Sequence, residues 1–103
     1  MLAHNVYFKL KDRTDSARAA LVSACKEHLT GHPGTVFFAA GTLATELDRP
    51  VNDRDWDVAL HLVFRTPEDQ DSYQVAPRHH RFVEENRDSW DVVRVFDSIV
   101  DGV

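Results

Sequence analysis

Four segments of the chain have the alternation or the composition of β-strands. Residues Ala3–Lys11 and Asp55–Arg65 alternate between two faces with a period of two, which is typical of a strand. Thr35–Thr45 and Trp90–Val100 are rich in β-branched and aromatic residues, which also favour strands. In the first segment both faces carry large side chains, so we expect that strand to be covered on both sides.

A first helical segment lies between the first two predicted strands. It follows Thr14 or Asp15, either of which can cap a helix, and the helix-breaking run Gly31–Gly34 predicts its end. Its apolar stripe consists of Ala17, Ala20, Leu21, Ala24, Cys25 and Leu29. Because these positions recur at helical spacing, they predict a helix with one apolar face.

The second helical segment is interrupted by a proline. Thr66 followed by Pro67 is a strong helix start, since threonine caps and proline fits the first helical position. The helix is predicted to run to about Val75. Pro77 has no amide proton and disfavours a helical conformation in the residue before it, so the helix must break or kink there. A second helical piece then covers Arg78–Asp88.

The order of the elements is therefore β-α-β-β-α-β within one domain of residues 1–103. This order predicts an α+β, ferredoxin-like fold, in which a four-stranded antiparallel sheet carries helices on one of its faces. The other face would be bare, although the strands place apolar side chains on it as well. Because an apolar sheet face is not left in water, we expect a homodimer in which two sheets cover each other.

Composition narrows the classes of partner and compartment. The net charge of −5 and the absence of a basic cluster argue against nucleic-acid binding, which needs a basic face. No apolar run is long enough to span a membrane, and no secretory signal is visible at the N-terminus. Cys25 is the single cysteine and cannot form an intramolecular disulfide. We expect a cytoplasmic protein with no nucleic-acid or membrane partner.

The densest group of chemically active side chains follows Tyr73. Helical spacing places His79 on the same face as the apolar Phe82 and Val83. His80 instead falls among charged residues and is expected to be solvated. An inward-facing histidine is either a core residue with satisfied hydrogen bonds or a proton-transfer group, and the spacing leaves both interpretations open.

Tyr73, His79 and His4 are the strongest candidates for one shared pocket. The break at Pro77 changes the helix angle, which would let the phenol of Tyr73 and the imidazole of His79 converge on one cavity. These two groups suit general acid and base catalysis. His4 begins the first strand and would enter the same cavity if its face meets the helices. The alternative is that Tyr73 ends a short helix with its hydroxyl at the surface.

No metal or cofactor site is expected. The chain has no His-x-x-x-His spacing, no glycine-rich phosphate loop, no Gly-x-Ser-x-Gly elbow and no Cys-x-x-Cys pair. Its several histidines invite a metal hypothesis, but no ligand spacing supports it.

Five motifs together resemble the stress-responsive A/B barrel (Dabb) family. They are His4–Leu10, the Gly34–Gly41 strand, Asp57–Leu60, the helix Tyr73…Pro77-x-His79…Phe82-Val83 and the ending Val93–Asp97. The resemblance covers nearly the whole chain. It implies a dimeric α+β barrel built from ferredoxin-like protomers, in agreement with the bare sheet face.

The resemblance also implies roles for the pocket residues. Plant polyketide cyclases of this family are similar around a Tyr-x-x-His-Pro-x-His segment, which implies that Tyr73 positions or polarises a substrate and that His79 is the general base. His4 would line the pocket. This chain departs from the segment at Ala76, where those proteins often have a histidine. Some members of the family carry a divalent cation, which has no assigned place in this chain.

Four functional hypotheses follow. The preferred one is a small-ligand-binding Dabb dimer of unassigned activity, linked to stress, whose pocket includes Phe82 and Val83. The second is an acid–base enzyme of the polyketide-cyclase type that acts on an apolar, carbonyl-bearing molecule. A cofactor-free monooxygenase and a purely structural dimerisation module are the others. Convergence of His79 and Tyr73 in an enclosed cavity would favour an enzyme, whereas His79 bonded to backbone would disfavour it.

Overall fold

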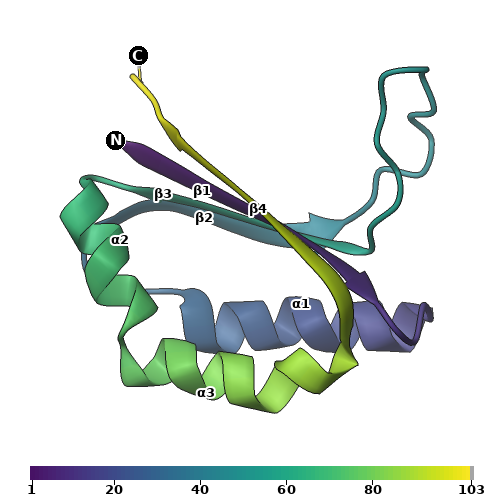
Figure 1. The fold of residues 1–103 in the computed structure, drawn as a ribbon, viewed down its shortest axis with the longest axis horizontal. Coiled ribbons are helices and arrows are strands. Elements are labelled where there is room, and N and C mark those ends of the chain that lie inside the picture. Colours follow the sequence, from purple (N-terminus) through teal and green to yellow (C-terminus); the bar gives the residue numbers. More distant parts are fainter. Residues whose placement is uncertain (103) are drawn as a thin grey trace.

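The computed structural model describes residues 1–102 and contains one antiparallel sheet with all three α-helices on the same face (Figure 1). The elements are β1 (Leu2–Leu10), α1 (Asp15–Leu29), β2 (Thr35–Thr42), β3 (Val58–Phe64), α2 (Pro67–Gln74), α3 (Pro77–Asn86), a 3-10 turn (Arg87–Ser89) and β4 (Trp90–Ile99). The predicted β-α-β-β-α-β order, with its second helix broken in two, is confirmed.

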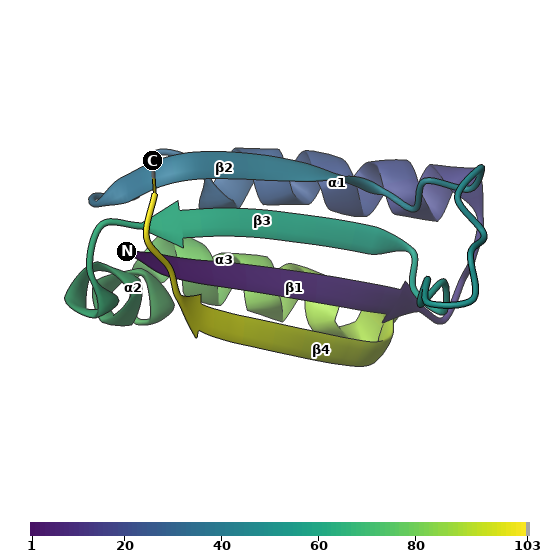
Figure 2. The ribbon, with the colours of Figure 1, turned by 90° about the horizontal axis from the view of Figure 1, so that it is seen from above.

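The sheet has the strand order β2-β3-β1-β4, and every neighbouring pair is antiparallel. Figure 2 shows its open face, with the helices behind the strands. β1 is central, so its residues from Leu2 to Phe8 have partners on both sides: His4 pairs with Leu62 of β3 and with Asp97 of β4. The ferredoxin-like fold class predicted above is therefore confirmed.

Side-chain caps explain where the helices begin. The hydroxyl of Thr14 accepts a hydrogen bond from the backbone N–H of Ala17, and the hydroxyl of Thr66 accepts one from the N–H of Asp69. After α1 the chain turns at Gly31, whose φ of 74° lies in the left-handed region that favours glycine.

The core lies between the helices and the alternate residues of β1 and β3 that face them. Its buried residues are Val6, Phe8, Leu10, Leu21, Cys25, Leu29, Val58, Leu60, Leu62, Phe64, Tyr73 and Phe82. Burial raises the pKa of the Cys25 thiol to about 12, so this cysteine is an inert core residue.

Two strand boundaries were predicted too widely. The second strand ends at Thr42 rather than Thr45, and the third begins at Val58 rather than Asp55. The connection of residues 43–57 is consequently longer than predicted, and it rises from the sheet on the side opposite the helices (Figure 1).

A buried carboxylate explains the late start of β3. Asp57 is almost fully buried, and its carboxylate accepts hydrogen bonds from the backbone N–H of Leu10 at 2.8 Å and from Nε of Arg18 at 2.9 Å. Arg13 donates to the same carboxylate through Nε. The side chain of Asp57, rather than a strand carbonyl, thus pairs with the end of β1.

No helix within residues 1–102 has the length and apolar character needed to cross a membrane.

Candidate functional site

The bend between α2 and α3 brings Tyr73 and His79 together. Val75 ends α2, and Ala76 has an extended backbone with φ −66° and ψ 141°, as expected for a residue before proline. Pro77 then occupies the first turn of α3, so the chain leaves one helix and enters the next at a sharp bend (Figure 1). As a result the rings of Tyr73 and His79 lie edge to face, with centroids 4.7 Å apart.

Tyr73 is buried, with only 2% of the residue exposed. Its hydroxyl therefore does not lie at the surface, as the alternative interpretation required. His79 is half-buried, whereas His80 is exposed. Phe82 is buried and Val83 is half-buried on the inward face of α3. In the structure, as the helical spacing in the sequence predicts, His79 faces inward and His80 faces the solvent.

His4 reaches the same place from the sheet. It lies on the helix-facing side of β1, is buried, and its ring centroid is 6.0 Å from that of Tyr73. Nδ1 of His4 lies 2.5 Å from a carboxylate oxygen of Asp97, which stands directly opposite on β4. The side chain of Asp97 is 49% exposed, so the pair lies at the solvent-accessible edge of the site.

A cavity of about 140 Å³ joins these groups between α3 and the β1–β4 side of the sheet. Its lining residues are His4, Val6, Phe8, Leu60, Tyr73, Gln74, His79, Phe82, Val83, Trp90, Val93 and Val95. All five residues predicted from the sequence as site residues line it. Most of the remaining wall is apolar, which suits a small ligand with few polar atoms.

The electrostatics of the cavity give Tyr73 and His79 complementary protonation states. Burial is the largest cause that lowers the pKa of His79 below its ordinary value, and three neighbouring imidazoles lower it further. These neighbours are His80, His4 and His32, and the backbone of Gln74 acts in the opposite direction. Burial also raises the pKa of Tyr73, with a smaller contribution from Cys25. The phenol therefore keeps its proton while the imidazole stays neutral.

Two buried polar atoms of the cavity wall have no hydrogen-bond partner within residues 1–102. Nδ1 of His79 and Nε1 of Trp90 are buried and have no hydrogen-bond partner there. Buried polar atoms are normally paired, so such atoms at a cavity wall are places where a ligand or a water molecule can bind. Within residues 1–102 the imidazole of His79 thus has one unpaired nitrogen, Nδ1, while a hydrogen bond with the backbone of Gln74 acts to raise its pKa.

Sequence reasoning missed Asp97 and His32. His32 is buried next to the site, its ring centroid lies 5.0 Å from that of Tyr73, and its Nε2 is bonded to the carbonyl of His28. It lies in an irregular turn, where no periodicity reveals direction. Asp97 shares its strand face with Val93 and could have been found only from the register between β1 and β4.

No group of three or more histidine, cysteine or acidic side chains within residues 1–102 is arranged to hold a metal ion. The cavity wall therefore offers no evident ligand set for the divalent cation that some family members carry.

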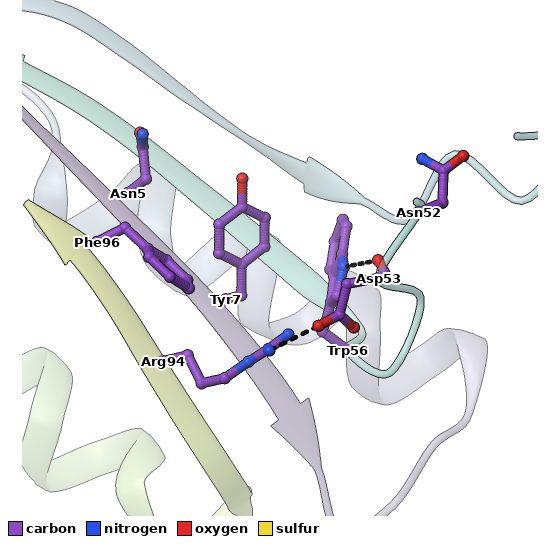
Figure 3. A pocket seen from close by; sticks show the side chains of 7 residues that line it. All are labelled: Asn5, Tyr7, Asn52, Asp53, Trp56, Arg94 and Phe96. Carbon is purple, nitrogen blue, oxygen red and sulfur yellow. Dashed lines mark hydrogen bonds and ion pairs between the residues drawn. The ribbon is translucent and has the colours of Figure 1, made fainter. Parts of the chain in front are cut away.

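A larger hollow lies on the open face of the sheet, away from Tyr73 and His79. It has a volume of about 520 Å³ and is lined by Asn5, Tyr7, Asn52, Asp53, Trp56, Arg94 and Phe96 (Figure 3). Tyr7 lies in its middle, with ring centroids 5.0 Å from Trp56 and 5.9 Å from Phe96. Nη1 of Arg94 donates to the carboxylate of Asp53 at 2.7 Å, and this hydrogen bond is the main cause that lowers the pKa of Asp53.

Comparison with known proteins agrees with this architecture. A Dabb family protein from Mesorhizobium loti is 18% identical, with a TM-score of 0.79 over 98% of this chain and 97% of that one. A dimeric ferredoxin-like protein of unknown function from Thermobifida fusca is 15% identical, with a TM-score of 0.77 over 96% and 90%. Hydroxynitrile lyase from Passiflora edulis is 17% identical, with a TM-score of 0.76 over 99% and 94%.

These identities are low, so the three structures establish likeness of fold alone. No curated protein matches the chain. The model of the family described as Stress responsive A/B Barrel Domain, however, matches residues 2–100. The resemblance inferred from the five motifs is thereby confirmed, and the chain belongs to the stress-responsive A/B barrel (Dabb) family.

Proposed function

We propose that this protein binds a small apolar carbonyl compound in the cavity between α3 and the sheet and transfers a proton on it. The observation that carries the proposal is the pairing, in one cavity, of a neutral imidazole whose Nδ1 has no partner within residues 1–102 with a protonated phenol, their ring centroids 4.7 Å apart. Tyr73 donates a hydrogen bond to the carbonyl oxygen of the ligand. His79 takes a proton from the neighbouring carbon.

The protonation states support these two roles. A general base must be unprotonated to act, and the lowered pKa of His79 keeps it neutral at neutral pH. A hydrogen-bond donor to a developing oxyanion must keep its proton, and the raised pKa of Tyr73 has that effect. Burial of Tyr73 strengthens the hydrogen bond that its phenol donates, because little water competes for it.

The size of the cavity limits the ligand. A cavity of about 150 Å³ in another protein accommodates one benzene molecule. The cavity of about 140 Å³ in this chain is of that size, which favours compounds with a single ring. The Passiflora relative is a hydroxynitrile lyase, so the fold is compatible with enzymatic chemistry on a small molecule.

The binding half of the proposal is tested by thermal shift with one-ring ketones such as acetophenone and phenylacetone. A ligand that binds the folded state raises the melting temperature by mass action. His79→Ala should abolish the shift, whereas His80→Ala, which changes an exposed neighbour, should preserve it. Equal effects of the two substitutions, or no effect of His79→Ala, would remove the case for an oriented site.

The catalytic half is tested by hydrogen exchange on phenylacetone in D₂O, followed by NMR. We expect the protein to accelerate loss of the signal of the CH₂ group between ring and carbonyl. Tyr73→Phe and His79→Gln should each slow the reaction by about 10²-fold or more, while His80→Gln should not. If the ketone binds but its hydrogen exchange is not accelerated, the proposed ligand binding stands and the proposed catalysis is contradicted.

We propose further that the protein is a homodimer joined through the open face of the sheet. Large apolar side chains remain exposed on that face, including Phe37, Val92 and Phe96. An apolar patch of this kind marks an interaction surface. The Thermobifida relative is described as dimeric, which supports the same arrangement for this chain.

A further inference from the structure

The imidazoles of His4 and His79 both line the cavity. A carboxylate fixes the orientation of the His4 ring. His4 and Asp97 stand opposite each other on β1 and β4, with Nδ1 of the imidazole 2.5 Å from Oδ1 of the carboxylate. An ionised carboxylate only accepts hydrogen bonds, so Nδ1 of His4 is the donor and carries a proton. In the neutral ring the other nitrogen, Nε2, is then left with its lone pair.

The two histidines of the cavity differ in this respect. Nδ1 of His79 has no hydrogen-bond partner among the described residues 1–102, so no bond to that nitrogen selects between the tautomers of His79. No carboxylate is among the residues that line the cavity, and Asp97 reaches it only through His4. The other titratable groups that face His4 are Tyr73 from α2 and, beyond it, His79 from α3.

We propose that Asp97 is a positioning residue that holds His4 with its proton on Nδ1, and that Nε2 of His4 is a second proton acceptor in the cavity. Tyr73 would then lie between two imidazoles, one from the sheet and one from α3. The use of His4 as an acceptor rests on the proposed proton-transfer function. The tautomer of His4 does not, because it follows from the pair with Asp97 alone.

The step balances without any further reactant. A C–H bond next to the carbonyl of the ligand breaks, and its proton binds Nε2 of His4. The bonding electron pair stays on the ligand as an enolate, whose oxygen accepts the hydrogen bond of Tyr73. The imidazolium formed on His4 is balanced by the negative charge of Asp97, and reversal of the step returns the proton.

The tautomer is tested by long-range ¹H–¹⁵N NMR on histidine-labelled protein without ligand. At a pH of about 8.5, where ordinary imidazoles are neutral, the spectrum shows which ring nitrogen of each histidine carries the proton. The signals of His4 are identified by their loss in His4→Gln. We expect wild-type His4 to be protonated on Nδ1.

Asp97→Leu should remove this state, because no acceptor then remains opposite Nδ1 to hold its proton. Asp97→Glu should keep the wild-type tautomer. Asp91→Leu, which makes the same change at an exposed position at the start of β4, should have no effect. Wild-type His4 protonated on Nε2, or the same tautomer in wild type and Asp97→Leu, would overturn the proposal.

Exchange of phenylacetone in D₂O then tests the use of the acceptor. In the His79→Gln background, where His4 is the acceptor that remains, we expect Asp97→Leu and His4→Gln to lower the residual rate by a similar factor of about 10-fold or more, and Asp91→Leu to leave it unchanged. If the wild type catalyses no exchange while the tautomer of His4 depends on Asp97, the proposed function fails and the positioning role of Asp97 stands. If His79→Gln slows exchange and Asp97→Leu does not lower the rate that remains, His4 is no acceptor and only the proposed function stands.

Discussion

At the scale of single residues, two buried nitrogens of the cavity wall have no hydrogen-bond partner within residues 1–102. They belong to His79 and Trp90. Leaving a buried polar group unpaired costs about 1–3 kcal/mol, so the fold gives up stability at this place. A ligand or water molecule that pairs with these atoms recovers the loss.

The titration of His79 gives a prediction with a definite sign. Its pKa lies below the ordinary value of 6.5, so at slightly acidic pH the unfolded chain binds a proton that the folded chain does not. Stability should therefore fall as the pH drops below 6.5. Urea unfolding at about pH 7.5 and about pH 5.5 measures the difference. We expect His79→Gln to reduce it more than His80→Gln, which removes only one of the neighbouring imidazoles; an unchanged pH dependence in His79→Gln would contradict the burial effect.

Asp57 is a second residue whose side chain is expected to contribute to the free energy of unfolding. Burial alone would raise its pKa, but hydrogen bonds from Leu10, Arg18 and Arg13 outweigh that effect and lower it. Asp57→Asn keeps the shape of the side chain and removes its charge, so we expect a loss of about 2–3 kcal/mol in the free energy of unfolding.

Asp55→Asn is the matched control for that substitution. Asp55 also contacts Arg13, but its side chain is largely exposed, and exposed ion pairs contribute about 0–1 kcal/mol. Urea denaturation of both variants provides the comparison. Similar losses in the two variants would show that the carboxylate of Asp57 has no special role at the end of β1.

At the scale of elements, the bend between α2 and α3 is what creates the site. α2 is short and carries few apolar residues, and the residue it buries is Tyr73. α3 is anchored to α1 instead: Arg78 donates to the backbone carbonyls of Thr30 and Glu27, both at 2.7 Å. The distance between the phenol and His79 therefore depends on the geometry of the bend rather than on direct bonding between them.

Pro77→Ala tests that dependence. Alanine permits a helical conformation at Ala76, so α2 and α3 should partly straighten and separate Tyr73 from His79. We expect a change in stability of less than about 1 kcal/mol but a clear loss of ligand-induced thermal shift. Pro67→Ala is the control, because Thr66 still caps α2 and the bend is untouched. An unaltered thermal shift in Pro77→Ala would mean that packing against the sheet, not proline, sets the bend.

At the scale of the whole molecule, the two faces of the sheet have different roles. The face toward the helices holds the core and the cavity, while the open face carries exposed apolar residues and the hollow around Tyr7 (Figures 2 and 3). The long connection of residues 43–57 rises beside that open face (Figure 1). A second protomer placed there would leave the cavity on the helix side accessible.

The dimer prediction is tested by sedimentation at micromolar concentration. We expect about twice the chain mass of 11.7 kDa. Phe96→Glu places a charge in the open face, where the side chain is 54% exposed, and should shift the protein toward monomer. Val75→Glu changes an exposed residue on the helix side and should leave the dimer intact. A monomeric wild type, or a dimer insensitive to Phe96→Glu, would contradict this interface.

Local patterns in the sequence account for most of the elements and for part of the site. Alternation along β1 and β3, the threonine caps and Pro77 are readable because strands, caps and breaks depend on residues close together in the chain. The inward direction of His79 follows in the same way from its spacing to Phe82. The start of β3 was misjudged because it depends on a distant partner, since the carboxylate of Asp57 binds the backbone of Leu10.

The amino-acid sequence by itself therefore determined the order of elements, the break between the helices and the face on which His79 lies. Only the tertiary structure decided that Asp97 holds His4, since the two residues are 93 positions apart and meet through the register of β4 against β1. It also decided that Nδ1 of His79 has no hydrogen-bond partner among residues 1–102. Register and burial arise from hydrogen bonds and packing between distant segments, and no local periodicity encodes them.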